Sequence, residues 1–171
     1  SLVCRRPANK NAGTLEQNVY ALGGLLRTEV GYESTQFEII APSAQWKKAL
    51  NLQAEALMGP SFEKQELLLE ADLLAKEARS ALDRMEEFST EKALELAFDP
   101  IRLGGYGEIT EAGLKGLEPE ELSGFFRAFY VPSRMTVVLS GDFSASEVLN
   151  EAVRAFEKFP AVSKAASPAL M

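Results

Sequence analysis

Residues 130–160, YVPSRMTVVLSGDFSASEVLNEAVRAFEKFP, are the stretch of this 171-residue chain whose local physics is clearest. Residues 135–139 form a short apolar run rich in β-branched side chains, which predicts a buried strand, and Ser-Gly-Asp then supplies turn residues that end it. Ser144 or Ser146 can cap a following helix. The predicted apolar face of that helix consists of Val148, Leu149, Ala152, Val153 and Phe156. Pro132 ends an earlier helix, so the stretch predicts helix, proline turn, core strand and helix.

Two helix patterns and a hairpin pattern open the chain. Thr14 is a good N-cap for a helix that should end at the Gly23-Gly24 pair. Residues 25–30 and 35–40 are rich in β-forming side chains and are separated by turn residues, so they predict a β-hairpin. A second helix pattern begins near Trp46 and ends before Gly59.

The longest helix pattern covers residues 62–87, with no glycine or proline inside it. Its predicted apolar face consists of Leu67, Leu74, Ala78, Ala81, Leu82 and Met85. A shorter helix is expected near residues 90–98, before a glycine-rich loop. Pro119 suits the first turn of the next helix, whose aromatic side chains we expect in the core: Phe125, Phe126 and Phe129.

Three strand candidates among five or six helices predict an α+β fold in which helices pack on a mainly antiparallel sheet. A three-stranded sheet is thin for this much helix, so we expect that the first strands of such a domain are missing from this chain. Residues 1–160 are expected to form one domain, and the Ala, Ser and Pro of residues 161–171 predict a linker or tail.

Composition excludes several classes of function. The net charge of −7 argues against nucleic acid and anionic membranes as partners, because both favour clustered Lys and Arg. No run approaches the ~20 apolar residues of a membrane span. The chain has no histidine, which removes the commonest general base and zinc ligand. The single cysteine, Cys4, can form no internal disulfide and has no histidine to activate it, so it predicts neither an oxidising compartment nor a nucleophile.

Several short motifs follow one another along the chain. They are Gly13-Thr14, Leu22-Gly23-Gly24, Thr35-Gln36-Phe37, Pro60-Ser61-Phe62, Glu70 with Glu77, and the closing series Tyr130, Pro132, Met135 and Gly141-Asp142. In this order and spacing, residues 8–160 resemble the insulinase and pitrilysin family of zinc metallopeptidases, which includes the mitochondrial processing peptidase. The resemblance implies a fold like one half of such a metallopeptidase.

The chain departs from that family at the zinc motif. In active members His-x-x-Glu-His lies just before the Gly-Thr pair, whereas here the same register reads Cys4-Arg5-Arg6-Pro7-Ala8. The histidines and the catalytic glutamate are absent, and a proline at this point spoils the helix that the two histidines would share.

The resemblance also extends to one further zinc-ligand position. Glu77 matches the third zinc ligand of the family, and Glu70 the glutamate one heptad before it. A catalytic zinc site uses three protein ligands, so Glu77 alone cannot hold zinc, and we expect both carboxylates to be solvated. We therefore expect no cofactor in this chain and zinc only in a catalytic partner half.

The strand at residues 25–30 is the other candidate site. The resemblance implies an edge strand beside the active site that binds extended peptides by strand addition, which needs only unpaired backbone groups. Arg27-Thr28 replaces the family's usual Asn-Ala, and Arg27 and Glu29 can alternatively be charges that protect an edge from aggregation. The glycines of residues 103–107 give a weak phosphate-loop pattern, and we expect a surface loop there.

These observations predict a non-catalytic insulinase-family domain without peptidase activity of its own. We expect it to act as a structural or substrate-enclosing partner of a catalytic zinc metallopeptidase half or subunit, in a homodimer or heterodimer. One alternative is a fragment of a zinc metalloendopeptidase whose active site lies elsewhere in the parent protein. The other is a peptide-binding or protein-binding module that uses the exposed edge strand.

Overall fold

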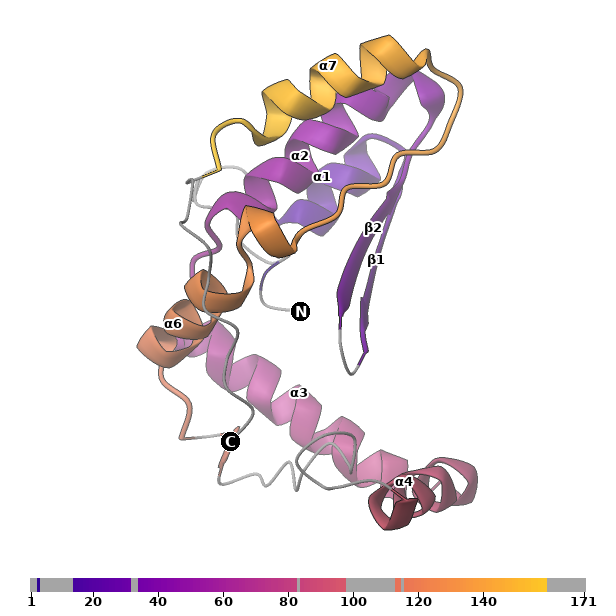
Figure 1. Cartoon of the computed structure of the whole chain (residues 1–171). Helices are drawn as coiled ribbons and strands as arrows, with labels where there is room; N and C mark the ends of the chain where they lie inside the picture. The colour runs from indigo at the N-terminus through magenta and orange to yellow at the C-terminus, as the bar shows by residue number, and fades with distance from the viewer. Residues whose placement is uncertain are drawn as a thin grey trace. The chain divides into compact units, whose positions relative to one another are not determined.

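The structure is a computed structural model that describes residue 3 and residues 14–31, 34–82, 84–97, 113–114 and 116–159. The chain divides into two compact units, residues 1–62 with 120–171 and residues 63–119, which are described separately. The described part of the first unit combines a two-stranded antiparallel sheet with helices, and that of the second is helical (Figure 1). The predicted α+β class is confirmed.

Helix α1 (Leu15–Ala21) is short, and local hydrogen bonds fix both of its ends. The Thr14 hydroxyl accepts a hydrogen bond from the Gln17 N–H at 3.1 Å, and the Gln17 side chain accepts one from the Thr14 N–H at 3.1 Å. At the other end Gly23 adopts a φ of +74°, and the N–H groups of Gly23 and Gly24 donate to last-turn carbonyls at 2.9 and 3.0 Å. The glycine pair therefore ends α1 as predicted and turns the chain into the sheet.

The predicted hairpin is confirmed as β1 (Leu25–Val30) and β2 (Thr35–Ile40), which pair antiparallel. Alternate side chains of the two strands form an inner face that packs against α1 and helix α2 (Trp46–Met58). The buried centre of this cluster is Leu15, Val19 and Ala56, surrounded by Leu26, Phe37, Ile39 and Leu52. One face of the hairpin is thus covered by helices.

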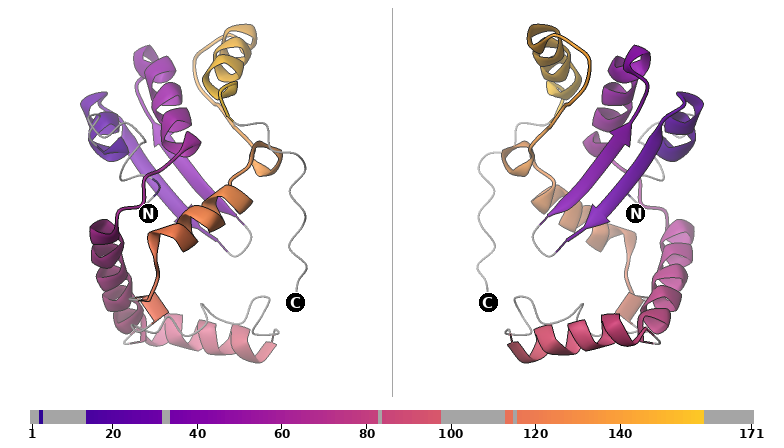
Figure 2. Two further views of the ribbon diagram at one scale, coloured as in Figure 1. Left: turned by 90° about the vertical axis from the view of Figure 1, so that its left-hand side faces the viewer. Right: turned by 90° about the vertical axis from the view of Figure 1, so that its right-hand side faces the viewer.

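A second core cluster joins α2 to helix α7 (Ala145–Phe156). Its buried members are Leu50, Ala54 and Ala155. Lys47 and Glu147 form an ion pair of 2.6 Å between the same two helices. Since α2 contacts both α1 and α7, it is the central helix of this layer (Figures 1 and 2).

Helix α6 (Pro119–Phe129) connects to the hairpin through a series of aromatic rings. Phe126 is buried and stacks on Tyr130 at a centroid distance of 4.6 Å, and Tyr130 in turn lies 6.3 Å from Phe37 of β2. The Tyr130 hydroxyl donates to the Thr35 hydroxyl at 3.3 Å. The prediction of a fully buried aromatic face is wrong at Phe125, which is 55% exposed and stacks on Phe129.

The second unit contains α3 (Lys64–Leu82) and α4 (Met85–Ala97). The prediction of one helix over residues 62–87 is therefore wrong, because a second helix begins at Met85. Burial in α3 follows a row at steps of four residues, made by Leu67, Ala71 and Ala75. The predicted apolar face is correct at Leu67 but wrong at Leu74 and Met85, which are exposed, and the side chains of Ala78, Ala81 and Leu82 lie outside the described residues.

Residues 135–140 are the main departure from the prediction. They are extended, with Met135 at φ −102° and ψ 141°, yet they form no strand ladder within the described residues. Val137 and Val138 are exposed, and Leu139 packs against the α2–α7 cluster. The predicted buried strand is wrong because a strand requires a partner, and the sheet of the described residues contains only β1 and β2.

Helix α7 follows this run and begins as predicted. The Ser144 hydroxyl accepts a hydrogen bond from the Glu147 N–H at 3.3 Å and caps the helix. Its buried row includes Ala155, whereas Leu149 and Val153 of the predicted apolar face are exposed. No helix among the described residues is long and apolar enough to cross a membrane.

Candidate functional site

The two glutamates that the sequence resemblance singled out lie on α3. Glu77 is exposed and Glu70 is partly covered, and their spacing of seven residues, about two helical turns, directs them to one side of the helix. Within the described ranges, no group of three or more His, Cys, Asp and Glu side chains is placed to hold a metal ion. Glu77 thus has no co-ligands among the residues described. The register Cys4, Pro7 and Ala8 and the loop 103–107 lie outside those residues.

The three edge-strand candidates lie on β1, where the pleat separates them onto two faces. Thr28 faces Phe37 of β2 in the pairing register and is half-buried. Arg27 and Glu29 are exposed on the opposite face. The structure therefore places Arg27 and Glu29 together and points Thr28 to the other side of the sheet.

Arg27 is engaged within the hairpin. Its guanidinium lies 3.6 Å from the Glu38 carboxylate, and the two residues are direct cross-strand partners. The Arg27 side chain is 63% exposed and that of Glu38 41%, so water screens the pair and it contributes little to stability. Charges in this position are typical of an edge strand that must stay soluble.

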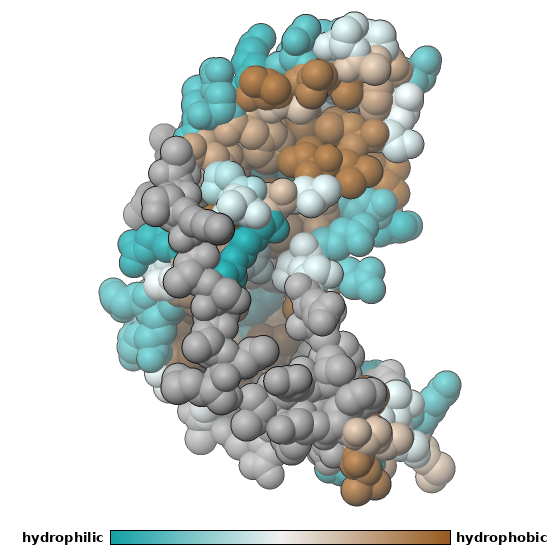
Figure 3. Space-filling model, viewed as in Figure 1, coloured by the Kyte–Doolittle hydropathy of each residue, from teal (hydrophilic) through white to brown (hydrophobic). Residues whose placement is uncertain are grey.

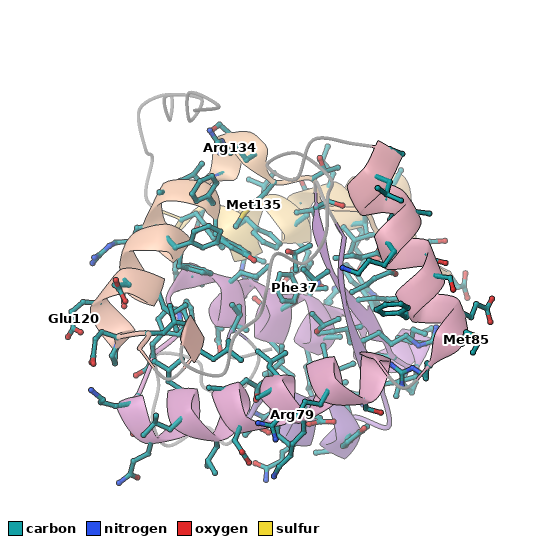
Figure 4. All side chains as sticks on the ribbon, turned by 90° about the horizontal axis from the view of Figure 1, so that it is seen from below. Phe37, Arg79, Met85, Glu120, Arg134 and Met135 are labelled. Atoms are coloured by element: carbon teal, nitrogen blue, oxygen red, sulfur yellow. The ribbon has the colours of Figure 1, made fainter. Side chains whose placement is uncertain are left out.

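Contacts from the helices hold the hairpin in place. The Gln53 side-chain amide of α2 donates to the Phe37 carbonyl at 2.6 Å, and Tyr130 bonds to Thr35 near the hairpin turn. Phe37 lies among the side chains at the interior of the view from below (Figure 4). β1 pairs with β2 along one edge, and no described strand pairs with its other edge. That edge offers main-chain groups of the kind that an added strand uses.

Sequence reasoning missed a second unpaired main-chain edge, at residues 136–140. No backbone hydrogen bond joins these residues to any other described residue. The apolar β-branched run was the available signal; it predicted a buried strand, whereas the structure shows extended backbone without a described partner strand. It carried no information about whether a neighbouring strand was present.

Comparison with known families and proteins identifies relatives of this arrangement. Residues 116–170 match the family model described as the peptidase M16 inactive domain. The chain is 24% identical over 144 residues to the probable mitochondrial-processing peptidase subunit beta of Arabidopsis thaliana. That alignment covers 84% of this chain and 27% of the Arabidopsis protein, so the chain corresponds to about a quarter of that relative.

The fold has a counterpart among solved structures. The crystal structure of a protease from Helicobacter pylori superposes with a TM-score of 0.79 at 20% sequence identity. The match covers 99% of this chain and 41% of the protease chain. At this level of identity the match establishes the fold.

Proposed function

Because the chain is an insulinase- and pitrilysin-like domain of the non-catalytic kind, we propose that it acts as the partner of a catalytic zinc metallopeptidase domain. In that role it supports the catalytic domain or helps to enclose its peptide substrates. It supplies no zinc ligands and cleaves no peptide bond by itself. The catalytic domain would supply the zinc.

The absence of histidine from all 171 residues carries this proposal. Zinc peptidases activate water on a metal held by three protein ligands, usually including histidine. Glu77 is a single exposed carboxylate, and a lone carboxylate does not retain zinc against water. The match of residues 116–170 to an inactive domain supports the same conclusion.

The first test measures zinc binding and peptidase activity of the purified chain. We expect calorimetry to detect no stoichiometric zinc, and a Glu77→Ala variant to behave like the wild-type chain. Labelled unstructured peptides should remain intact with or without added zinc. Peptide cleavage that requires zinc and stops with a chelator would refute the proposal.

The second test adds a catalytic domain of the same family that carries an intact His-x-x-Glu-His motif. We expect the two proteins to co-elute, and peptide cleavage by the mixture to exceed that by the catalytic domain alone. An inactive catalytic domain, with Gln in place of the motif glutamate, should co-elute equally and cleave nothing. If neither complex nor activation is observed with cognate catalytic domains, the partner role is wrong.

A second candidate function is peptide binding by strand addition to β1, which the unpaired edge of the described sheet favours. Fluorescence anisotropy with labelled extended peptides should then give saturable binding. A Val30→Pro substitution, which removes a backbone N–H that points away from β2, should weaken it, whereas Arg154→Ala on α7 should not. Equal binding by both variants would exclude β1 as the binding edge.

A further inference from the structure

A groove open to solvent lies between α1 and α2, and its volume of about 380 Å³ is within the ~300–1,000 Å³ of small-molecule sites. The views in Figure 2 show α2 between α1 and α7, in agreement with the contacts that α2 makes with both helices. The groove therefore lies on the side of α2 away from α7. It is separate from the hydrophobic residues gathered over α7 in Figure 3.

Each helix contributes residues at helical spacing to the groove. On α2, Lys48, Leu52 and Glu55 follow at steps of four and three residues, so they lie on one face of the helix. Asn18 and Leu22 are four residues apart, on α1 and at its C-terminal cap. The apolar part of the lining includes Leu22 and Leu52, and both are half-buried. Leu52 also packs on the core cluster between α1, α2 and the hairpin, so this apolar part belongs to the folded core and exists before a ligand binds.

The two charged side chains of the lining are at opposite ends of this face. Lys48 is in the first turn of α2 and Glu55 is in its last turn, seven residues later, so their Cα atoms are about 10 Å apart along the helix axis. Both side chains are exposed, and neither forms an ion pair or a side-chain hydrogen bond with another residue that the structure describes. Lys47, by contrast, is already paired with Glu147. The groove thus offers one cationic and one anionic group to a ligand.

The order of these charges along α2 is unfavourable for the helix itself. Helix N-termini favour acidic side chains and C-termini favour basic ones, whereas Lys48 and Glu55 have the reverse arrangement. A ligand with its anionic end at Lys48 and its cationic end at Glu55 would have the arrangement that the helix dipole favours. Charge complementarity therefore specifies a zwitterionic ligand and its direction.

Two side-chain amides add hydrogen-bonding groups to the lining, Asn51 on α2 and Asn18 on α1. The Asn51 NH₂ group donates to the Lys47 carbonyl at 2.7 Å and to the Glu151 carboxylate at 3.4 Å, which fixes the orientation of this amide. Its carbonyl oxygen can then accept a hydrogen bond from a peptide N–H. An apolar side chain, main-chain amides and two oppositely charged ends are together the features of a short peptide.

We propose that this groove binds a short linear peptide of about three residues with both termini free. Its carboxylate lies at Lys48, its ammonium group at Glu55, and its central side chain on Leu22 and Leu52. An extended chain spans at most ~3.3–3.6 Å per residue, so three residues match the ~10 Å between the two charged positions. The site goes beyond the proposed partner role, since it needs neither zinc nor a catalytic domain and is not the β1 edge.

The first experiment titrates the whole chain with the tripeptide Ala-Leu-Ala and follows the side-chain amide signals by NMR. The signals of Asn18 and Asn51 should shift and saturate at millimolar peptide. The Gln53 amide, which donates to the Phe37 carbonyl on the sheet side of α2, is the internal control and should not shift. The absence of any saturable shift of the Asn18 and Asn51 signals up to ~10 mM peptide overturns the proposal.

Changes to the two ends of the peptide test the charge contacts. N-acetylation of the peptide should weaken binding to the wild-type chain by about two- to fivefold, the size of an exposed ion pair, but should have little further effect on Glu55→Gln. C-terminal amidation should act in the same way with Lys48→Gln. These comparisons assign each end of the peptide to one side chain. Peptides with blocked ends that bind as tightly as the free peptide overturn the proposal.

Three control variants separate the groove from the rest of the surface. Glu157→Gln and Lys158→Gln change exposed charges that follow α7 and should leave tripeptide binding unchanged. Val30→Pro tests the β1 edge and should also leave it unchanged. Tripeptide binding that both Lys48→Gln and Glu55→Gln leave undiminished, or that Val30→Pro abolishes in a chain that stays folded, overturns the assignment to this groove.

Discussion

Replacing Gly24 by alanine should destabilise the first unit by a predictable amount. A Cβ atom at this position would lie 2.7 Å from the Ile40 carbonyl oxygen, 3.1 Å from Val19 Cγ1 and 3.2 Å from the Val19 carbonyl oxygen. Two of these three atoms belong to the backbone of α1 and β2, so they cannot rotate away. The helix end and the strand end must separate to admit the methyl group.

The cost follows from two opposing effects. Overpacking of this kind lowers the free energy of unfolding by about 1–3 kcal/mol, and the reduced conformational entropy of the unfolded chain offsets about 0.4–1 kcal/mol of this loss. We therefore expect Gly24→Ala to lower the free energy of unfolding by about 1–2 kcal/mol. For a chain of this length, that corresponds to a decrease in Tm of about 2–8 °C.

The assay is urea unfolding followed by tryptophan fluorescence. Trp46 is the only tryptophan and lies in the first unit, so its emission reports on the unit that contains Gly24. Gly59→Ala is the matched control, because its added Cβ meets no atom within 4 Å and its φ of 178° suits any residue. If the two variants unfold at the same urea concentration, the close approach of α1 and β2 at Gly24 does not limit packing and the reasoning is wrong.

Three further predictions follow from single contacts. Val19→Ala removes a fully buried side chain from the α1–hairpin cluster and should lower the unfolding free energy by about 2 kcal/mol in the same assay. Ser144→Ala removes the α7 cap and should cost about 1 kcal/mol, whereas Ser146→Ala lies inside the helix and should stabilise it by a few tenths at most, because alanine is the better helix former; equal effects would exclude Ser144 as the cap. The Glu147 carboxylate accepts a hydrogen bond from Lys47 and raises the pKa of Lys47 above the usual 10.5. The Lys47–Glu147 pair therefore stabilises the fold fully below pH 10.5, and this stabilisation is lost as the pH rises through the raised pKa. NMR titration of the Lys47 ammonium should show the raised pKa, and Glu147→Gln should return it toward the usual lysine value.

Features that depend on a few neighbouring residues were predictable from the sequence. The Thr14 cap, the Gly23-Gly24 helix end, the hairpin and the Ser144 cap are all present as expected. Each depends on a side-chain oxygen, a backbone conformation or a turn composition within a few residues. The closing series of Tyr130, Pro132, Met135 and Gly141-Asp142 could be read from the sequence. Only the structure shows what Tyr130 does: its hydroxyl donates to the Thr35 hydroxyl near the hairpin turn.

Errors arose wherever burial depends on distant parts of the chain. Periodicity identifies which residues of α3 and α7 are apolar, but Leu74, Leu149 and Val153 are exposed because no described element covers them. The break before Met85 likewise divides a pattern that looks continuous. Helix propensity and the spacing of apolar residues depend on neighbouring residues, whereas the burial of a side chain depends on which elements pack over it in the folded domain.

The sequence by itself determined that this chain cannot form a His-x-x-Glu-His motif, because it contains no histidine. It also determined that residues 135–139 are extended, since β-branched side chains favour that backbone. Only the tertiary structure decided that Arg27 pairs with Glu38 across the hairpin and that residues 136–140 have no described strand beside them. A backbone conformation is a property of one segment, but a ladder or an ion pair requires a second segment that folding brings alongside.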